Sequence, residues 1–487
     1  MSGAWPAEPV VYELNTAAWL HDVGVRAGRP ATLGSVPDAE WDVVTPEGVD
    51  AVWLMGVWQR SPVGVELARP NEEASWHEVL PDLTDADVIG SAYCIRSYVV
   101  DDRFGGRDGL AAARAALAAR GKRLLVDFVP NHVAPDHPWI VEHPDRFVQG
   151  TADALAVDPA AFIQVGSSIV ARGRDPYFAP WPDVAQLDAF APSLRSAVID
   201  TLADIAAQAD GVRCDMAMLM ISSVFTRTWG ALVGAAPATE YWADVIGAIR
   251  AAHPDFLFVA EAYWDMEWDL QQLGFDHCYD KRLYDRLLHE GAGAVRGHLQ
   301  ADLGYQRGLI RFIENHDEPR AAAVMSRPQS VAAAVMIATL PGATLWHEGQ
   351  FDGWKVRLPV FLGRRPAEPS DAGLRDVYLA LIAAAPTIRV GEWSDCAATG
   401  WPGDSSCEQL VTWCWRSDGE RSLVVVNLSD DTAHARVHVP WDDLGGRDWR
   451  MDDVLTGAVF ERSGDELASE GLYVGLAPWG CHVLRWT

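Results

Sequence analysis

The sequence predicts an α/β fold, namely a (β/α)8 TIM barrel with a small insert domain after strand 3 and a C-terminal antiparallel β-domain. Three observations support this prediction. Short apolar runs end abruptly in polar clusters, as strands buried on both faces do. Helical stretches lie between these runs, which indicates parallel β/α units. About eight such units begin over roughly 380 residues, the number of units that a closed barrel requires.

The predicted strands are spread along the chain at irregular intervals. We expect them to begin near Val10, Val52, Leu124, Val212, Leu257, Asp276, Leu309 and Thr344. Helices are predicted between some of them, at Gly109–Arg120, Ser193–Gln208 and Thr239–Ala252. A doubly wound open sheet is the competing arrangement, but no Gly-rich phosphate-binding turn follows the first strand.

Two changes in sequence character divide the chain. Residues 133–186 hold many Pro, Asp, His and aromatic residues and lack helical periodicity, so we predict an inserted domain B there. From residue 388 onward, β-rich runs separated by turn signals predict a β-sandwich, domain C, over residues 388–487. Residues 1–132 and 187–387 then form the barrel, domain A.

Composition narrows the classes of function. The chain has 487 residues, of which 49% are hydrophobic and 22% charged, the balance of a globular protein. Lys and Arg number 39 against 68 Asp and Glu, which gives a net charge of −29. So acidic a chain repels phosphate backbones and anionic lipid, and we therefore expect neither a nucleic acid nor a membrane as a partner. No obligatory protein partner is evident either.

The expected compartment is the cytoplasm. The sequence has no run of about 18 apolar residues, and its first basic residue is Arg26, so neither a membrane span nor the cationic start of a signal peptide is indicated. The seven cysteines are an odd number and include no C-x-x-C pair. This pattern fits reduced thiols better than a disulfide framework or a zinc site.

Three acids lie at the C-terminal ends of predicted strands: Asp215, Glu261 and Asp317. In a β/α barrel those strand ends converge on one face. Arg213 shares a strand face with Asp215 and would hold it ionised, and His316 adjoins Asp317. Grouped carboxyl groups push their pKa values apart, so that one stays charged while another keeps its proton. Cleavage of a glycosidic bond needs this division, because one carboxylate attacks or stabilises the sugar carbon and one acid protonates the departing oxygen.

Four segments of the chain resemble, in this order, the four sequence signatures of the α-amylase family of glycoside hydrolases (family 13): Asp127–His132, Gly211–Asp215, Val259–Glu261 and Glu314–Asp317. An insert after strand 3 and an all-β C-terminal domain are also similar to that family. The resemblance implies that Asp215 is the nucleophile and Glu261 the general acid/base. It implies that Asp317 is the third acid, which binds sugar hydroxyls and stabilises the transition state.

The resemblance also implies the surroundings of the three acids. Side chains at the cleavage point would bind the sugar, namely Tyr93, Asp127, His132, Arg213, His316 and Arg320. No cofactor is required, but Asn131 matches a family residue that often binds a structural calcium ion beside the insert. The family commonly has an Asp-Leu-Asn element in this insert, whereas this chain reads Gln186-Leu187-Asp188, so the calcium ion stays an open alternative.

The expected substrate is an α-linked glucosaccharide. Met218 and Leu219 stand where many endo-acting amylases carry Lys-His, and the run Asn315–Arg320 is similar to that of family members acting on short α-glucosides. The resemblance implies a retaining α-glycosidase that acts by double displacement on oligosaccharides or small α-glucosides. A transglycosidase, of the glucanotransferase or phosphorylase type, would use the same glycosyl-enzyme intermediate. A non-catalytic sugar-binding barrel is the alternative from another class.

Two further hypotheses concern residues outside the four signatures. Arg357, Arg364 and Arg365 form a basic cluster after the eighth predicted strand. They would either hold an anionic substrate group or phosphate, or form structural ion pairs on the barrel rim. A metal-dependent barrel hydrolase would use the histidines between residues 132 and 143, but the sequence contains no H-x-H motif.

Overall fold

A computed structural model describes residues 4–487. Eight parallel strands close into a barrel in the order β1-β14-β13-β12-β11-β10-β5-β2. They are β1 Val10–Asn15, β2 Ala51–Met55, β5 Arg123–Phe128, β10 Gly211–Cys214, β11 Leu257–Ala260, β12 His277–Tyr279, β13 Leu309–Arg311 and β14 Ala343–His347. Each begins within one residue of its predicted position. The predicted (β/α)8 barrel is confirmed.

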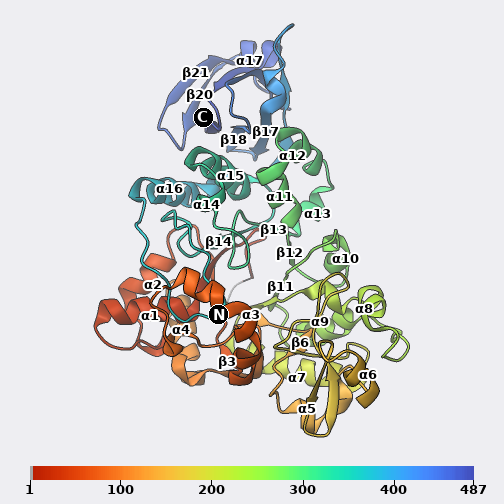
Figure 1. Cartoon of the computed structure of the whole chain (residues 1–487). Coiled ribbons are helices and arrows are strands. Elements are labelled where there is room, and N and C mark those ends of the chain that lie inside the picture. The colour runs from red at the N-terminus through yellow and green to blue at the C-terminus, as the bar shows by residue number, and fades with distance from the viewer. Residues whose placement is uncertain (1–3) are drawn as a thin grey trace.

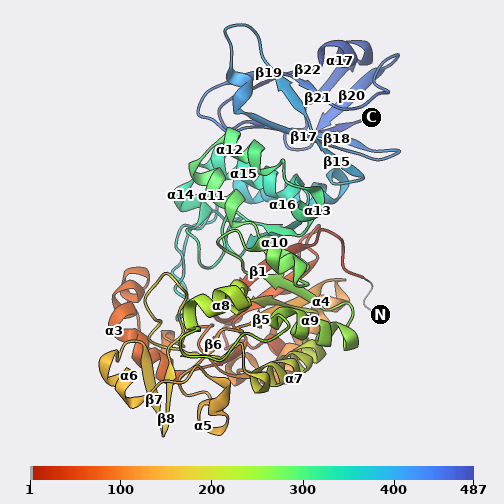
Figure 2. The ribbon, with the colours of Figure 1, turned by 90° about the vertical axis from the view of Figure 1, so that its right-hand side faces the viewer.

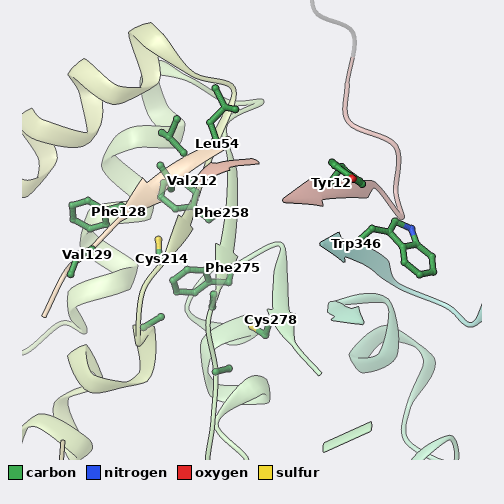
Figure 3. Close-up of a cluster of buried hydrophobic side chains, with 14 of the residues drawn as sticks. Tyr12, Leu54, Phe128, Val129, Val212, Cys214, Phe258, Phe275, Cys278 and Trp346 are labelled. Atoms are coloured by element: carbon green, nitrogen blue, oxygen red, sulfur yellow. The ribbon is translucent and has the colours of Figure 1, made fainter. Parts of the chain in front are cut away.

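The side chains of the barrel strands divide between two cores, because successive residues of a strand point to opposite faces. One set belongs to the large core outside the barrel, and Figure 3 shows Leu54, Phe128, Val212 and Phe258 of this set. The other set fills the barrel interior. Its members include Val11, Trp53, Leu125, Val259, Tyr279 and Leu345.

The interior rows end in charged residues at the C-terminal mouth of the barrel. Asp127 lies two residues after Leu125, and Glu261 lies two residues after Val259. Residues two apart in a strand share a face. Strand geometry alone therefore directs these polar side chains inward, above an apolar interior layer.

Helices surround the barrel, as Figure 1 shows. The longer ones are α1 Thr16–Ala27, α3 Pro62–Val79, α4 Gly106–Ala119, α7 Pro192–Gln208, α9 Tyr241–Ala252, α11 Lys281–His289, α15 Arg327–Thr339 and α16 Ala372–Ile388. The shorter ones are α2 Asp38–Val44, α8 Ser222–Trp229, α10 Glu267–Gln272, α12 Ala292–His298, α13 Leu303–Arg307 and α14 Ala321–Val324. Among residues 4–487, no helix combines the length and the apolar character that crossing a membrane requires.

Two excursions leave the barrel. After β2, strands β3 Trp58–Arg60 and β4 Ile95–Val100 pair antiparallel, with α3 between them, a pair that the sequence analysis did not include. After β5 comes the predicted insert, in which β6 pairs with β9 and β7 with β8. Its elements are β6 His132–Val133, α5 Trp139–Glu142, α6 Ala152–Val157, β7 Phe162–Val165, β8 Ser168–Ala171 and β9 Ala185–Gln186.

The C-terminal region forms two antiparallel sheets, β15-β17-β18-β23-β20-β21 and β16-β19-β22, which share an apolar core. Its elements are β15 Glu392–Asp395, β16 Ala397–Thr399, β17 Leu410–Arg416, β18 Arg421–Asn427, β19 Ala433–His438, β20 Asp448–Asp453, β21 Val459–Ser463, α17 Gly464–Glu470, β22 Leu472–Leu476 and β23 Cys481–Trp486. The predicted all-β C-terminal domain is confirmed. The domain boundaries at residues 132, 186 and 387 stay predictions.

The C-terminal sheets pack onto one end of α15. The indole nitrogens of Trp413 and Trp415 both donate to the main-chain oxygen of Thr339, at 3.1 and 2.8 Å. Figures 1 and 2 show these sheets at one end of the molecule and the insert, with α5, at the other. The barrel mouth is therefore bordered by the insert and not by the C-terminal sheets.

Candidate active site

Asp215, Glu261 and Asp317 lie together at the mouth of the barrel. Asp215 directly follows β10 and Glu261 directly follows β11, and these two strands are parallel neighbours. Asp317 belongs to the loop after β13. All three line one cavity of about 350 Å³. The structure therefore brings together three acids that are far apart in the sequence.

One guanidinium group links two of these acids. Nη1 of Arg213 donates to Oδ1 of Asp215 at 2.7 Å, and Nη2 lies 2.8 Å from Oε2 of Glu261. The same guanidinium lies over the rings of Trp53 and Tyr93, with centroids 5.4 and 5.2 Å away. Arg213 is 1% exposed, so its position is set by packing as well as by its two ion pairs.

Glu261 keeps its proton to a higher pH than an ordinary glutamate. Burial raises its pKa and the two neighbouring acids add to the rise, whereas Arg213 opposes it, with a resulting pKa of about 7. The Glu261 carboxyl accepts the N–H of Met216 at 2.6 Å and the hydroxyl of Tyr263 at 3.0 Å. A carboxyl group that titrates near neutral pH is suited to donate a proton and to take one back.

His316 connects the third acid to the barrel interior. Its Nδ1 is hydrogen-bonded to the buried carboxylate of Glu13 in β1, and its Nε2 lies 3.0 Å from Oδ2 of Asp317 and 2.6 Å from the hydroxyl of Tyr93. Burial disfavours a charged imidazole, but the two carboxylates outweigh burial and hold the pKa of His316 well above its ordinary value. Burial likewise disfavours ionised Asp317, and His316 outweighs it, so the pKa of Asp317 is about 2.

Two residues of the first signature lie at different depths. His132 lines the cavity together with Tyr93, and burial lowers the pKa of His132. Asp127 lies deeper, where its Oδ2 accepts the N–H of Gly56 at 2.7 Å. Burial raises the pKa of Asp127 to about 6, although Arg213 opposes the rise. Asp127, like Arg213, is not among the residues that line the cavity.

Arg320 lies behind the site. Its Nη1 donates to Oε1 of Glu314 at 2.7 Å and to the main-chain oxygen of Glu348 at 2.6 Å, and its Nε donates to the main-chain oxygen of Val356 at 3.2 Å. Arg320 is buried and does not line the cavity. It joins the loop after β13 to the segment after β14, and the sugar contact expected for it stays a prediction.

Several residues at the cavity were missed by the sequence analysis. Trp181 and Asp183 reach it from the insert, and Asn71 and Glu72 reach it from α3. Their local sequence carries no signal, because α3 and the insert approach the mouth only through tertiary packing. The sequence around Glu13 did contain a signal. Glu13 is an acid inside the apolar run of β1, and such an acid is seldom buried without a partner.

The chain is similar to proteins of known name. No protein-family model matches it. An α-amylase of Haloarcula japonica is 27% identical over 372 residues, which are 73% of this chain and 45% of that protein. An α-1,4-glucan:maltose-1-phosphate maltosyltransferase of Bifidobacterium longum is 24% identical over 483 residues, 90% of this chain and 56% of that protein. These similarities support the α-amylase family of glycoside hydrolases. It spans about half the length of these two relatives.

The fold agrees with this family. A noncanonic maltogenic α-amylase of Thermotoga neapolitana has a TM-score of 0.70 and 18% sequence identity, and the match covers 99% of both chains. At this low sequence identity, the structural similarity shows the fold alone. The similar proteins are named as an amylase, a glucosidase and a transferase, so the similarity leaves the choice between these reactions to the site.

The surroundings of Asn131 do not fit the calcium ion of the family. The side-chain nitrogen of Gln186 donates to the main-chain oxygen and to Oδ1 of Asn131, both at 2.9 Å, and to the main-chain oxygen of Leu187 at 3.0 Å. Carbonyl and amide oxygens are typical calcium ligands, and here N–H donors already occupy them. Over residues 4–487, no three His, Cys, Asp or Glu side chains are grouped so that they could hold a metal ion.

The three rim arginines differ in their contacts. Two of them, Arg364 and Arg365, are each ion-paired with two carboxylates, the partners being Asp82, Asp87, Asp22 and Glu348. These pairs agree with the structural alternative. Arg357 is exposed and donates to the main-chain oxygen of Asp317 at 2.6 Å. Arg357 is therefore the member of the cluster that touches the loop after β13, which carries Asp317.

Proposed function

We propose that the chain is a retaining α-glycosidase that cleaves α-glucosidic bonds of oligosaccharides or small α-glucosides. The observation that carries the proposal is a pair of unlike carboxyl groups in one cavity. Both carboxyl groups contact Arg213, and burial together with the neighbouring acids raises the pKa of Glu261 to about 7. One group is thereby suited to attack the sugar carbon and the other to protonate the leaving oxygen. Similarity to the α-amylase family supports the same chemistry.

The reaction proceeds by two displacements. First, a carboxylate oxygen of Asp215 bonds to the anomeric carbon while the bond from that carbon to the leaving oxygen breaks, and Glu261 gives its proton to that oxygen. Next, Glu261, now a carboxylate, takes a proton from water, and the water oxygen displaces Asp215 from the anomeric carbon. Asp215 is again a carboxylate and Glu261 again an acid. Two inversions leave the anomeric configuration unchanged.

The other cavity residues position the sugar. Asp317, held ionised by His316, accepts hydrogen bonds from sugar hydroxyls, and such bonds strengthen as positive charge develops on the sugar ring. Tyr93 presents an aromatic ring to the sugar's C–H face. Since α3 and the insert border a cavity of only about 350 Å³, the geometry favours short substrates or chain ends.

Product stereochemistry tests the proposal. Wild-type protein is incubated with maltose, isomaltose, sucrose, trehalose, maltodextrins and starch, and NMR identifies the first-formed anomer. We expect the α-anomer from at least one of these substrates, and no turnover by Asp215→Asn with the fold intact. Asp108→Asn, an exposed acid on α4, is the matched control and should keep the wild-type rate. A β-anomer as first product, or wild-type turnover by Asp215→Asn, would overturn the assignment.

A transglycosidase is the second candidate function. The similarity to a protein named as a maltosyltransferase favours it, because the same glycosyl-enzyme serves transfer when a sugar hydroxyl replaces water. Product ratios at rising maltose concentration distinguish the two reactions. A hydrolase keeps releasing glucose units to water, whereas a transferase gives longer oligosaccharides as its main products already at low acceptor concentration.

A further inference from the structure

A cavity of about 660 Å³ lies at the base of the barrel, which is the end where its strands begin. Its lining includes Leu257 and His277, the first residues of β11 and β12, and Gly308, which directly precedes β13. The three catalytic acids instead follow the last residues of barrel strands, and all strands of a parallel barrel run in the same direction. The base cavity is therefore separate from the catalytic cavity and lies at the opposite end of the strands.

Aromatic side chains form part of the wall of the base cavity. Its lining includes the rings of Trp5, Trp268 and Tyr305. Trp268 on α10 is 52% exposed, and its ring centroid lies 6.3 Å from that of Tyr305 on α13. Figures 1 and 2 show α10 beside α13. The indole nitrogen of Trp5 donates to the main-chain oxygen of Asp255 at 2.9 Å, which holds the ring of Trp5 at the cavity. Exposed aromatic surface in a concave place is typical of a ligand site.

His277 is a buried side chain of this cavity with one unused hydrogen-bonding atom. Its ring is 5% exposed, and its Nδ1 has no hydrogen-bond partner among residues 4–487. Burial lowers the pKa of His277 to about 4, and a hydrogen bond to the main chain of Arg307 opposes this fall only in part. The imidazole is therefore uncharged at neutral pH, and one of its nitrogens can accept a hydrogen bond. Buried polar atoms are rarely left without a partner, so the expected donor is a hydroxyl group in the cavity or a water that it holds.

The charges of the lining favour a neutral ligand. Three carboxylates, those of Asp255, Asp276 and Asp302, stand against one cation, Arg307. Asp276 is ion-paired with Arg250, and Asp302 accepts main-chain N–H groups at the start of α13. An excess of carboxylates opposes the binding of a phosphate or carboxylate group. Hydroxyl groups, in contrast, can donate to the exposed carboxylate of Asp255.

We propose that the base cavity is a second, non-catalytic binding site that takes a neutral saccharide. Trp268 and Tyr305 stack on the C–H face of a sugar ring. Asp255 and the imidazole of His277 accept hydrogen bonds from its hydroxyl groups, directly or through a water. This site goes beyond the proposed reaction, because it holds a sugar at the base of the barrel and leaves the three acids free to act.

Binding is measured by calorimetric titration with thiomaltotriose, in which sulfur replaces the linking oxygens so that the sugar resists hydrolysis. We expect wild-type protein to bind two molecules per chain, one at the acids and one at the base. Trp268→Ala should remove the second of these sites and leave kcat/KM for maltotriose unchanged. Trp401→Ala, which removes an exposed Trp of the C-terminal region, is the matched control and should keep both sites.

The number of sites separates the failure of this proposal from the failure of the proposed function. A fall from one site in the wild type to none in Trp268→Ala would support the base site and contradict sugar binding at the acids. An equal number of sites in the wild type and in folded Trp268→Ala would overturn the base site. A lower kcat/KM for maltotriose in folded Trp268→Ala would also contradict it, because Trp268 would then serve the catalytic cavity.

Two further measurements test how the sugar is recognised. His277→Phe keeps a ring and removes the acceptor, so it should weaken binding at the base site about tenfold. Unchanged affinity would remove His277 from the site. Glucose should compete with thiomaltotriose for the base site, whereas glucuronate, which matches glucose in size but is anionic, should not. Equal competition by both would contradict the preference for a neutral sugar.

Discussion

The carboxylate of Glu13 in the first barrel strand is hydrogen-bonded to Nδ1 of His316, a residue 303 positions later in the chain. Through the other ring nitrogen, His316 contacts Asp317 at 3.0 Å. A buried acid in β1 thereby acts on a carboxylate at the barrel mouth without touching the cavity. In the proposed mechanism Glu13 is a positioning residue, because it reaches Asp317 only through His316.

Replacing Glu13 should change the pH profile as well as the rate. Glu13→Gln removes one of the two carboxylates that raise the pKa of His316, so the imidazole loses its proton at a lower pH and Asp317 loses its cationic partner there. We expect kcat/KM to fall about tenfold and the alkaline decline of activity to begin at a lower pH. Initial rates from pH 4 to 9 check this. A merely structural Glu13 would lower the melting temperature and leave the shape of the profile unchanged.

The pKa of Glu261 sets the alkaline limb of the wild-type profile. As the proton donor, Glu261 acts in its protonated form, and its pKa is raised to about 7. As the pH rises through this value the acid form disappears, so kcat/KM for oligosaccharides should fall about tenfold per pH unit above it. Glu261→Gln should lose nearly all activity toward oligosaccharides and far less of the first step with α-glucosyl fluoride. A profile that stays flat to pH 9 would contradict the role of Glu261.

Gln186 should stabilise the insert without a metal ion. Gln186→Ala removes the side-chain NH2 group, whose two hydrogens are shared among three oxygens of Asn131 and Leu187, and the free energy of unfolding should fall by about 2 kcal/mol. Gln164→Ala, an exposed glutamine of the same insert, is the matched control. Thermal unfolding with EGTA or with added CaCl2 should give the same melting temperature for the wild type, since a ligand that does not bind the folded state cannot shift it. A melting temperature lowered by EGTA would show that a metal ion binds.

The sequence predicted the parts of this protein that depend on local pattern. The eight barrel strands are recognisable because each is a short apolar run with a polar end, and Asp215 and Glu261 stand directly after two such runs. Burial on both faces favours apolar residues in these strands. Because successive side chains of a strand point to opposite faces, these acids point inward at the C-terminal mouth of the barrel.

The parts that escaped prediction depend on tertiary contacts. Arg320 stands in a segment that resembles a substrate-binding one, but its guanidinium is taken up by Glu314 and main-chain oxygens behind the site. Trp181, which lines the cavity of the three acids, is one of 22 tryptophans, and no local pattern separates a Trp at a cavity from one in a core. Which Trp lines this cavity is decided by where the insert folds back.

The bonds from Trp413 and Trp415 to Thr339 bear on how far the chain can be shortened. Thr339 is the last residue of α15, so its carbonyl has no partner within the helix, and two indoles from the following domain supply one. A truncation at residue 388 would strip this helix end of its donors and uncover the apolar surface beneath the two indoles. Such a fragment should aggregate, because it would expose a contiguous apolar surface to solvent.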